Sequence, residues 1–142
     1  MEKENSPSGV QDYLKMLRRK YYFATNQLQL ARSKGQIKRL HGYIEELKID
    51  MAWLLLECGK FEEGLSMYSS VFGKQYREKK YVGIGRALTE MKRYGEAKNV
   101  LEKGLKEFPK SYALWEGLGI LHDALGEHLE ALNCFEAAIR NF

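Results

Sequence analysis

Hydrophobic residues in the last third of the chain recur with the period of an α-helix. They form two stripes, so this helix is expected to have neighbours on two sides. The first stripe is Tyr112, Trp115, Leu118 and His122, and the second is Leu114, Leu121 and Leu125. Gly126 ends the pattern, and a new helical period begins at Leu129. The segment therefore predicts two helices joined by a tight turn, with Ser111 as the N-cap of the first.

Small residues repeat along the chain with a fixed spacing. They form pairs twelve positions apart, at Ala52 and Gly64, Gly85 and Ala97, and Gly119 and Ala131. In two antiparallel helices such positions face each other, and Gly or Ala there allows the backbones to approach closely. The expected turns repeat in the same register, through Phe61, Tyr94 and His128. Three helical hairpins of the same design are therefore predicted, an all-α fold.

This period resembles that of the tetratricopeptide repeat family, whose pattern is W-x2-L-G-x2-Y, then A-x3-F, then P. The matching residues of the third copy are Trp115, Leu118, Gly119, His122, Ala131 and Phe135. Those of the second are Tyr81, Ile84, Gly85, Leu88, Ala97, Leu101 and Pro109. The resemblance covers residues 45–142 as about three repeats, 45–77, 78–111 and 112–142. It implies antiparallel helix pairs stacked into a right-handed superhelix with a concave face.

The N-terminal part does not follow the repeat. Residues 1–9 are expected to be disordered, and residues 10–44 are expected to form a helical region that packs on the array. Ser8 begins a capping box for the first helix, which should end near Gly35. The periodic segment 36–58 permits either one long helix or two helices separated at Gly42. The repeat pattern fails at Lys48, which occupies the place of Tyr81 and Trp115. At 142 residues, the chain has the size of one domain.

The resemblance also implies where a partner would bind. In this family, the first helix of each repeat lines the concave face, which receives a peptide or a partner segment. The corresponding positions here are Glu46, Ile49, Trp53, Leu56, Lys79, Val82, Arg86, Thr89, Glu90, Glu116, Ile120 and Asp123. Trp53 and Arg86 are the strongest candidates, since Trp and Arg most often carry interface energy. The Lys and Asn residues of the family's carboxylate clamp are absent from these positions.

The expected function is that of a non-enzymatic scaffold or adaptor that binds a protein or peptide. The alternatives are a secretion-type or assembly chaperone that holds a client, and a self-associating structural scaffold. The last helix pair would expose apolar residues and form an end interface, through which the chain could form a homo-oligomer. The residues of this end interface are Leu129, Leu132, Ile139 and Phe142.

Charge is distributed unevenly along the chain. Residues 1–43 carry nine basic and three acidic residues, whereas residues 112–142 carry one basic and five acidic residues. Opposite ends of this kind could attract each other between chains. The basic and aromatic cluster 18–23 could bind nucleic acid, but its basic side chains are expected to flank a buried stripe of Leu14, Leu17, Tyr21 and Leu28. We therefore expect no nucleic-acid partner.

No motif for catalysis, a metal or a cofactor is present, so neither enzymatic activity nor a cofactor is predicted. Cys58 and Cys134 are expected to be reduced thiols in helical apolar settings. No apolar run reaches the roughly 20 residues of a membrane span, and residues 1–9 do not form a secretory segment. The expected location is the cytoplasm.

Overall fold

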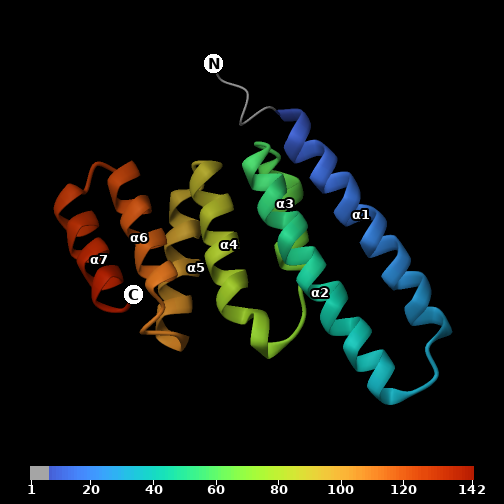
Figure 1. Cartoon of the computed structure of the whole chain (residues 1–142). Coiled ribbons are helices and arrows are strands. Elements are labelled where there is room, and N and C mark those ends of the chain that lie inside the picture. The colour runs from blue at the N-terminus through green and yellow to red at the C-terminus, as the bar shows by residue number, and fades with distance from the viewer. Residues whose placement is uncertain (1–6) are drawn as a thin grey trace. The chain divides into compact units, whose positions relative to one another are not determined.

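The computed structural model describes residues 7–142, which form seven α-helices and one short 3-10 helix and contain no strand (Figure 1). The all-α prediction is confirmed. The helices are α1 (Pro7–Leu30), α2 (Lys34–Glu57), α3 (Phe61–Ser69), α4 (Arg77–Glu90), α5 (Tyr94–Glu107), α6 (Tyr112–Ala124) and α7 (His128–Arg140), with the 3-10 helix η1 (Lys74–Tyr76) before α4.

Backbone contacts divide the chain into two compact units. The first extends to Phe72 and contains α1, α2 and α3, and the second, Gly73–Phe142, contains η1 and α4 to α7. Within the first unit, α2 packs against both α1 and α3. Within the second, α4 pairs with α5, α6 pairs with α7, and α6 contacts both helices of the preceding pair. Two helical hairpins are therefore stacked in the second unit.

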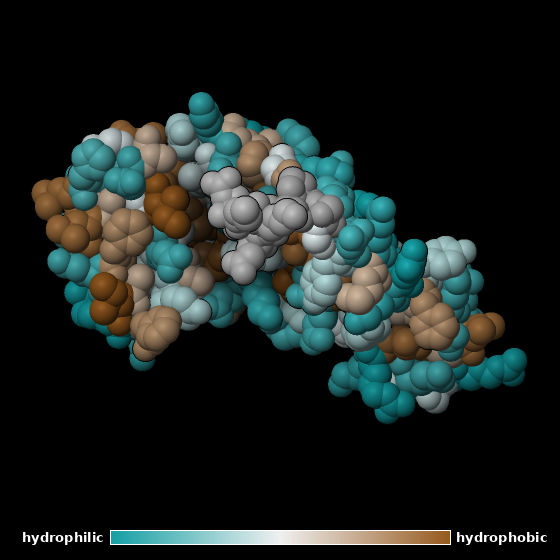
Figure 2. Space-filling view, turned by 45° about the horizontal axis from the view of Figure 1, so that its top comes forward, coloured by the Kyte–Doolittle hydropathy of each residue, from teal (hydrophilic) through white to brown (hydrophobic). Residues whose placement is uncertain are grey.

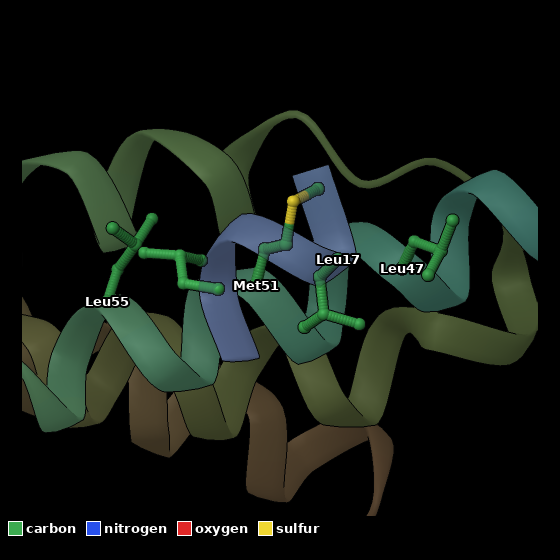
Figure 3. Packing of buried hydrophobic residues seen from close by; sticks show 5 residues of the cluster. Leu17, Leu47, Met51 and Leu55 are labelled. Atoms are coloured by element: carbon green, nitrogen blue, oxygen red, sulfur yellow. The ribbon is translucent and has the colours of Figure 1, made fainter. Parts of the chain in front are cut away.

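The first unit is held together by aliphatic packing between α1 and α2. Leu14 and Leu17 of α1 meet a row of buried side chains of α2, which comprises Leu47, Met51 and Leu55 (Figure 3). This is the buried stripe of α1 that the periodicity predicts, and Arg18, Arg19 and Lys20 are exposed as expected. The prediction of disorder over residues 1–9 is wrong for residues 7–9, because α1 begins at Pro7 rather than at a Ser8 cap. Residues 1–6 lie outside the described part of the chain.

Residues 34–57 form one continuous helix, which decides between the two alternatives for this segment. Ser33 caps it, since the Ser33 Oγ accepts a hydrogen bond of 3.1 Å from the Gln36 N–H. Gly42 does not interrupt it, because a glycine costs a helix only about 1 kcal/mol and α2 packs against α1. The expected boundary between residues 44 and 45 therefore falls inside a helix.

Lys48 has a structural role where the repeat pattern fails. Its Nζ lies 3.1 Å from Glu45 Oε1 and 3.3 Å from the Ser70 carbonyl oxygen. The second carboxylate oxygen of Glu45 accepts a hydrogen bond of 2.8 Å from the Phe72 N–H. Lys48 and Glu45 form an ion pair within α2, and their hydrogen bonds link α2 to the segment after α3. Lys48 stands at the position where the other repeats have Tyr81 and Trp115.

The pairs of small residues face the partner helix, as their spacing predicts. A Cβ added to Gly85 would lie 2.5 Å from Leu101 Cδ2, and one added to Gly119 would lie 2.7 Å from Phe135 Cε1. In the first repeat the glycine of the pair is on the second helix instead. A Cβ added to Gly64 of α3 would lie 2.7 Å from Leu56 Cδ2 of α2. The alanine partners of the three pairs are buried: Ala52, Ala97 and Ala131. The glycines therefore pack closely against the partner helix of each hairpin, and Gly64 also lies near its pair member Ala52.

The three hairpin turns have the same backbone conformation. Equivalent residues adopt a left-handed φ: Gly59 (78°), Lys92 (60°) and Gly126 (78°). In each turn the next N–H bonds to the carbonyl five residues earlier, for example Arg93 N–H to Leu88 O at 2.9 Å. This is the Schellman arrangement, in which glycine is the usual left-handed residue. The second helices then begin at Phe61, Tyr94 and His128, the three positions that the sequence aligns.

The buried face of α6 differs from the predicted stripes. It consists of Leu114, Leu118, Gly119, Leu121 and His122. Tyr112 and Leu125 are exposed and Trp115 is half-buried, so these three residues were wrongly expected in the core. Trp115 lies at the edge of the core, where its Nε1–H donates a hydrogen bond of 2.9 Å to the Pro109 carbonyl oxygen. The polar edge of an indole ring favours such a position, since a buried N–H needs a partner.

Candidate functional site

The first helices of the second and third repeats, α4 and α6, lie side by side in the second unit. Glycines of the helix pairs allow this close packing. A Cβ added to Gly117 of α6 would lie 3.1 Å from Leu101, and one added to Gly104 of α5 would lie 2.9 Å from Tyr81 and 3.1 Å from Leu114. Side chains of α4, α5 and α6 therefore interlock, and the outer sides of α4 and α6 form one surface.

We call this surface the α4–α6 face. Residues 34 positions apart occupy equivalent places in the repeat, so Val82 corresponds to Glu116 and Arg86 to Ile120. The predicted partner-binding residues on this face are Lys79, Val82, Arg86, Thr89, Glu90, Glu116, Ile120 and Asp123. Eight of the twelve predicted residues therefore belong to two adjacent helices.

The middle of the α4–α6 face combines apolar and charged groups. Ile120 is 49% exposed, so it presents an aliphatic side chain at this surface. Val82 and Arg86 are half-buried, whereas Lys79 and Glu116 are exposed. This combination suits a ligand with an apolar side chain next to a charged one.

Two of the predicted residues are already engaged within the chain. The Thr89 hydroxyl donates a hydrogen bond of 2.8 Å to the Gly85 carbonyl of its own helix. Asp123 Oδ1 lies 2.9 Å from His128 Nδ1, across the turn between α6 and α7. Both contacts orient these side chains towards their own unit.

The other predicted lining residues are in the first unit, on α2. Glu46 and Trp53 are exposed and Ile49 is half-buried. Leu56 is wrong as a surface residue, because it is buried against Gly64. It belongs to the packing between α2 and α3.

The predicted end interface consists of exposed residues. Leu129, Leu132, Ile139 and Phe142 are all exposed on or next to α7. Figure 2 shows hydrophobic residues gathered at the left edge of the view, where Figure 1 places α7. Phe142 meets Tyr112 edge to face, with 5.2 Å between the ring centroids. This aromatic pair is also on the surface, since both of its members are exposed.

A groove in the first unit was not predicted from the sequence. It has a volume of about 490 Å³, an apolar floor that includes Met51 and Met67, and Arg18 and two glutamates at its edges. Its lining residues are Leu14, Arg18, Met51, Leu55, Glu62, Glu63, Ser66, Met67 and Ser70. The sequence feature that could have indicated this groove is the pair Glu62 and Glu63, followed by Met67, on the short helix α3. The sequence did not show that α1 and α3 flank the same part of α2.

The two cysteines are free thiols, and burial raises the pKa of Cys134. His122 is buried, and its Nδ1 lies 3.0 Å from Glu127 Oε2. Within residues 7–142, no three His, Cys, Asp or Glu side chains cluster as metal ligands do. None of the described helices is both long and apolar enough to cross a bilayer.

Comparison with known proteins agrees with this geometry. Residues 81–111, which include most of α4 and all of α5, match the sequence model of the tetratricopeptide repeat family. Among solved structures, MamA MSR-1 C2 has a similar fold, with a TM-score of 0.56, 13% sequence identity and coverage of 95% of both chains. No curated protein is significantly similar to the chain in sequence. The chain therefore contains a tetratricopeptide repeat and has the helical-hairpin fold of that family.

Proposed function

We propose that the chain is a protein-interaction scaffold whose α4–α6 face binds a short segment of a partner protein. Stacked helical hairpins form extended surfaces suited to this purpose. The observation that carries the proposal is Ile120, an exposed aliphatic side chain at the place that Arg86 occupies in the preceding repeat. An apolar anchor of the ligand would pack on Ile120 and Val82, while an acidic group would pair with Arg86.

A library of displayed dodecapeptides tests the proposal directly. Peptides selected on the full chain should combine an aliphatic or aromatic residue with a nearby Asp or Glu. Ile120→Asp and Arg86→Glu should each weaken binding of a selected peptide by at least about tenfold, since each removes a contact near the centre of the interface. The affinity is measured by isothermal titration calorimetry with the synthetic peptide.

The matched control is Lys103→Glu, which makes the same change of charge at an exposed position of α5. It should leave peptide affinity unchanged. Circular dichroism verifies that each variant is folded, and Ile120→Ser supplies a milder change at an exposed site. Selected peptides that bind the Ile120 and Arg86 variants as tightly as the wild type would refute the assignment of this face.

A further inference from the structure

The exposed side of α7 corresponds to a side of α5 that is partly covered. On α5, Leu101, Leu105 and Phe108 lie at the repeat positions of Phe135, Ile139 and Phe142. Leu105 and Phe108 are half-buried, and α6 packs against α5. In contrast, Ile139 is 75% exposed and Phe142 is 93% exposed, so none of the described helices covers α7 in the same way. We call Leu132, Ile139 and Phe142 the α7 seam, whereas Phe135 of the same helix packs on Gly119 of α6.

The first helix has a second hydrophobic stripe that its packing on α2 does not use. The buried stripe includes Leu14, Leu17 and Ala24. The second stripe alternates steps of three and four residues, the spacing of a helix that packs against another helix. It consists of Tyr13, Met16, Lys20, Phe23, Gln27 and Leu30, which we call the α1 seam. Its four large apolar members are exposed, and Phe23 is 65% exposed.

Charge favours contact between the two seams over contact between identical seams. Helix α1 carries four basic residues and one acidic residue. Helix α7, which contains most of the α7 seam, carries two acidic residues and one basic residue. Pairing α1 with α1 would bring basic side chains together, and pairing α7 with α7 would bring acidic ones together. Contact between α1 and α7 juxtaposes opposite charges, which selects the partner and accelerates association.

We propose that the chain associates head to tail, with the α7 seam of one copy packed on the α1 seam of a second copy. The two surfaces differ, so the contact is heterologous, and each copy keeps one seam for a further neighbour. Association therefore produces open chains or closed rings rather than isolated two-fold dimers. This contact does not involve the α4–α6 face, so variants at Ile120 or Arg86 leave it intact.

Sedimentation velocity of the full chain at increasing concentration tests the proposal. The wild type should form species larger than a monomer, and these should dissociate at about 1 M salt, where the Debye length is only about 3 Å. Phe23→Asp disables the α1 seam and Ile139→Asp disables the α7 seam. Each variant alone should be monomeric, because a charge inside an apolar contact is strongly unfavourable.

The decisive measurement is an equimolar mixture of the two variants. Each variant retains the seam that the other lacks, so the mixture should form a heterodimer that grows no further. Tyr22→Asp and Asn133→Asp are the matched controls, since they introduce the same residue at exposed positions outside the seams and should associate as the wild type does. Circular dichroism spectra and melting curves of all four variants verify that they are folded.

Several results would overturn the proposal. A wild type that stays monomeric at the highest concentration would do so, as would a mixture of Phe23→Asp and Ile139→Asp that fails to associate. If Phe23→Asp alone still formed dimers, contact between identical α7 surfaces would replace the head-to-tail contact. A monomeric chain that bound a labelled single-stranded oligonucleotide through α1 would assign the α1 seam to nucleic acid instead.

Discussion

Replacing Gly85 with alanine tests the packing between α4 and α5. The new Cβ would lie 2.5 Å from Leu101 Cδ2 and 2.7 Å from Leu101 Cγ. Rotation of the end of the leucine side chain cannot relieve the contact with Cγ, so the whole side chain has to move. Leu101 is completely buried, and Gly117 of α6 lies near the same Cδ2 atom. A shift away from α4 therefore transfers the strain to the contact with α6.

The expected loss of stability follows from two opposing effects. Overpacking a well-filled core costs about 1–3 kcal/mol, and the lack of space around Leu101 places Gly85→Ala in the upper part of this range. Alanine also improves helix propensity by about 1 kcal/mol over glycine. We expect the free energy of unfolding to fall by about 1–2 kcal/mol, which lowers the melting temperature by about 4–8 °C per kcal/mol in a unit of this size.

Urea unfolding monitored by tryptophan fluorescence measures this change in the second unit. In a Trp53→Phe background, Trp115 is the only tryptophan, and it lies in the same unit as Gly85. The control is Gly95→Ala in α5, where no atom lies within 4 Å of the new Cβ; it should stabilise the chain by roughly 0.4–1 kcal/mol. If Gly85→Ala stabilised the chain as much as Gly95→Ala does, the close packing of α4 on Leu101 would be refuted.

Two further predictions concern a turn and the cysteines. Lys92 adopts the left-handed conformation that glycine adopts in the equivalent turns, so Lys92→Gly should raise the free energy of unfolding by about 1 kcal/mol, while Gly126→Ala should lower it by a similar amount; urea unfolding in which Lys92→Gly is destabilising would contradict this. Because burial raises the pKa of Cys134, its reactive thiolate is rarer at neutral pH, and Ellman's reagent should modify the half-buried Cys58 first. Equal rates in the native Cys58→Ser and Cys134→Ser variants would contradict the difference in burial.

The hairpins of the second unit could be predicted because their packing depends on backbone approach. Gly85 and Gly119 each receive a large side chain from the partner helix at a distance that excludes a Cβ. Such a restriction is visible in the sequence, because it requires two small residues at a fixed spacing. The turns are visible in the sequence as well, because the residue with a left-handed backbone conformation is usually glycine. Lys92 departs from this rule, but the residues on both sides of it align with the other repeats, and this alignment was sufficient to predict where the turn lies.

The first unit was less predictable because α2 has neighbours on two sides. Leu56 was assigned to the partner-binding surface by its place in the repeat, but in the structure it fills the space beside Gly64. The second and third repeats place the glycine of the pair on the first helix, whereas the first repeat places it on α3. The position of a residue in the repeat therefore did not determine which side chain is buried. The absence of a break at Gly42 could not be inferred either, since a helix tolerates a single glycine when packing compensates for its cost.

Residues of the α4–α6 face could be located but not interpreted from the repeat alone. Trp53, Arg86 and Ile120 occupy the same place in successive repeats and have entirely different side chains. The core, in contrast, uses similar groups at equivalent places, such as Leu101 and Phe135 against a glycine. Packing restricts the second set because each side chain must fit a closed space, whereas residues on the surface can vary with the partner. We therefore expect variation between repeats at a fixed position of the first helices to indicate where a partner binds, and this reasoning selects Ile120 and Arg86 for substitution.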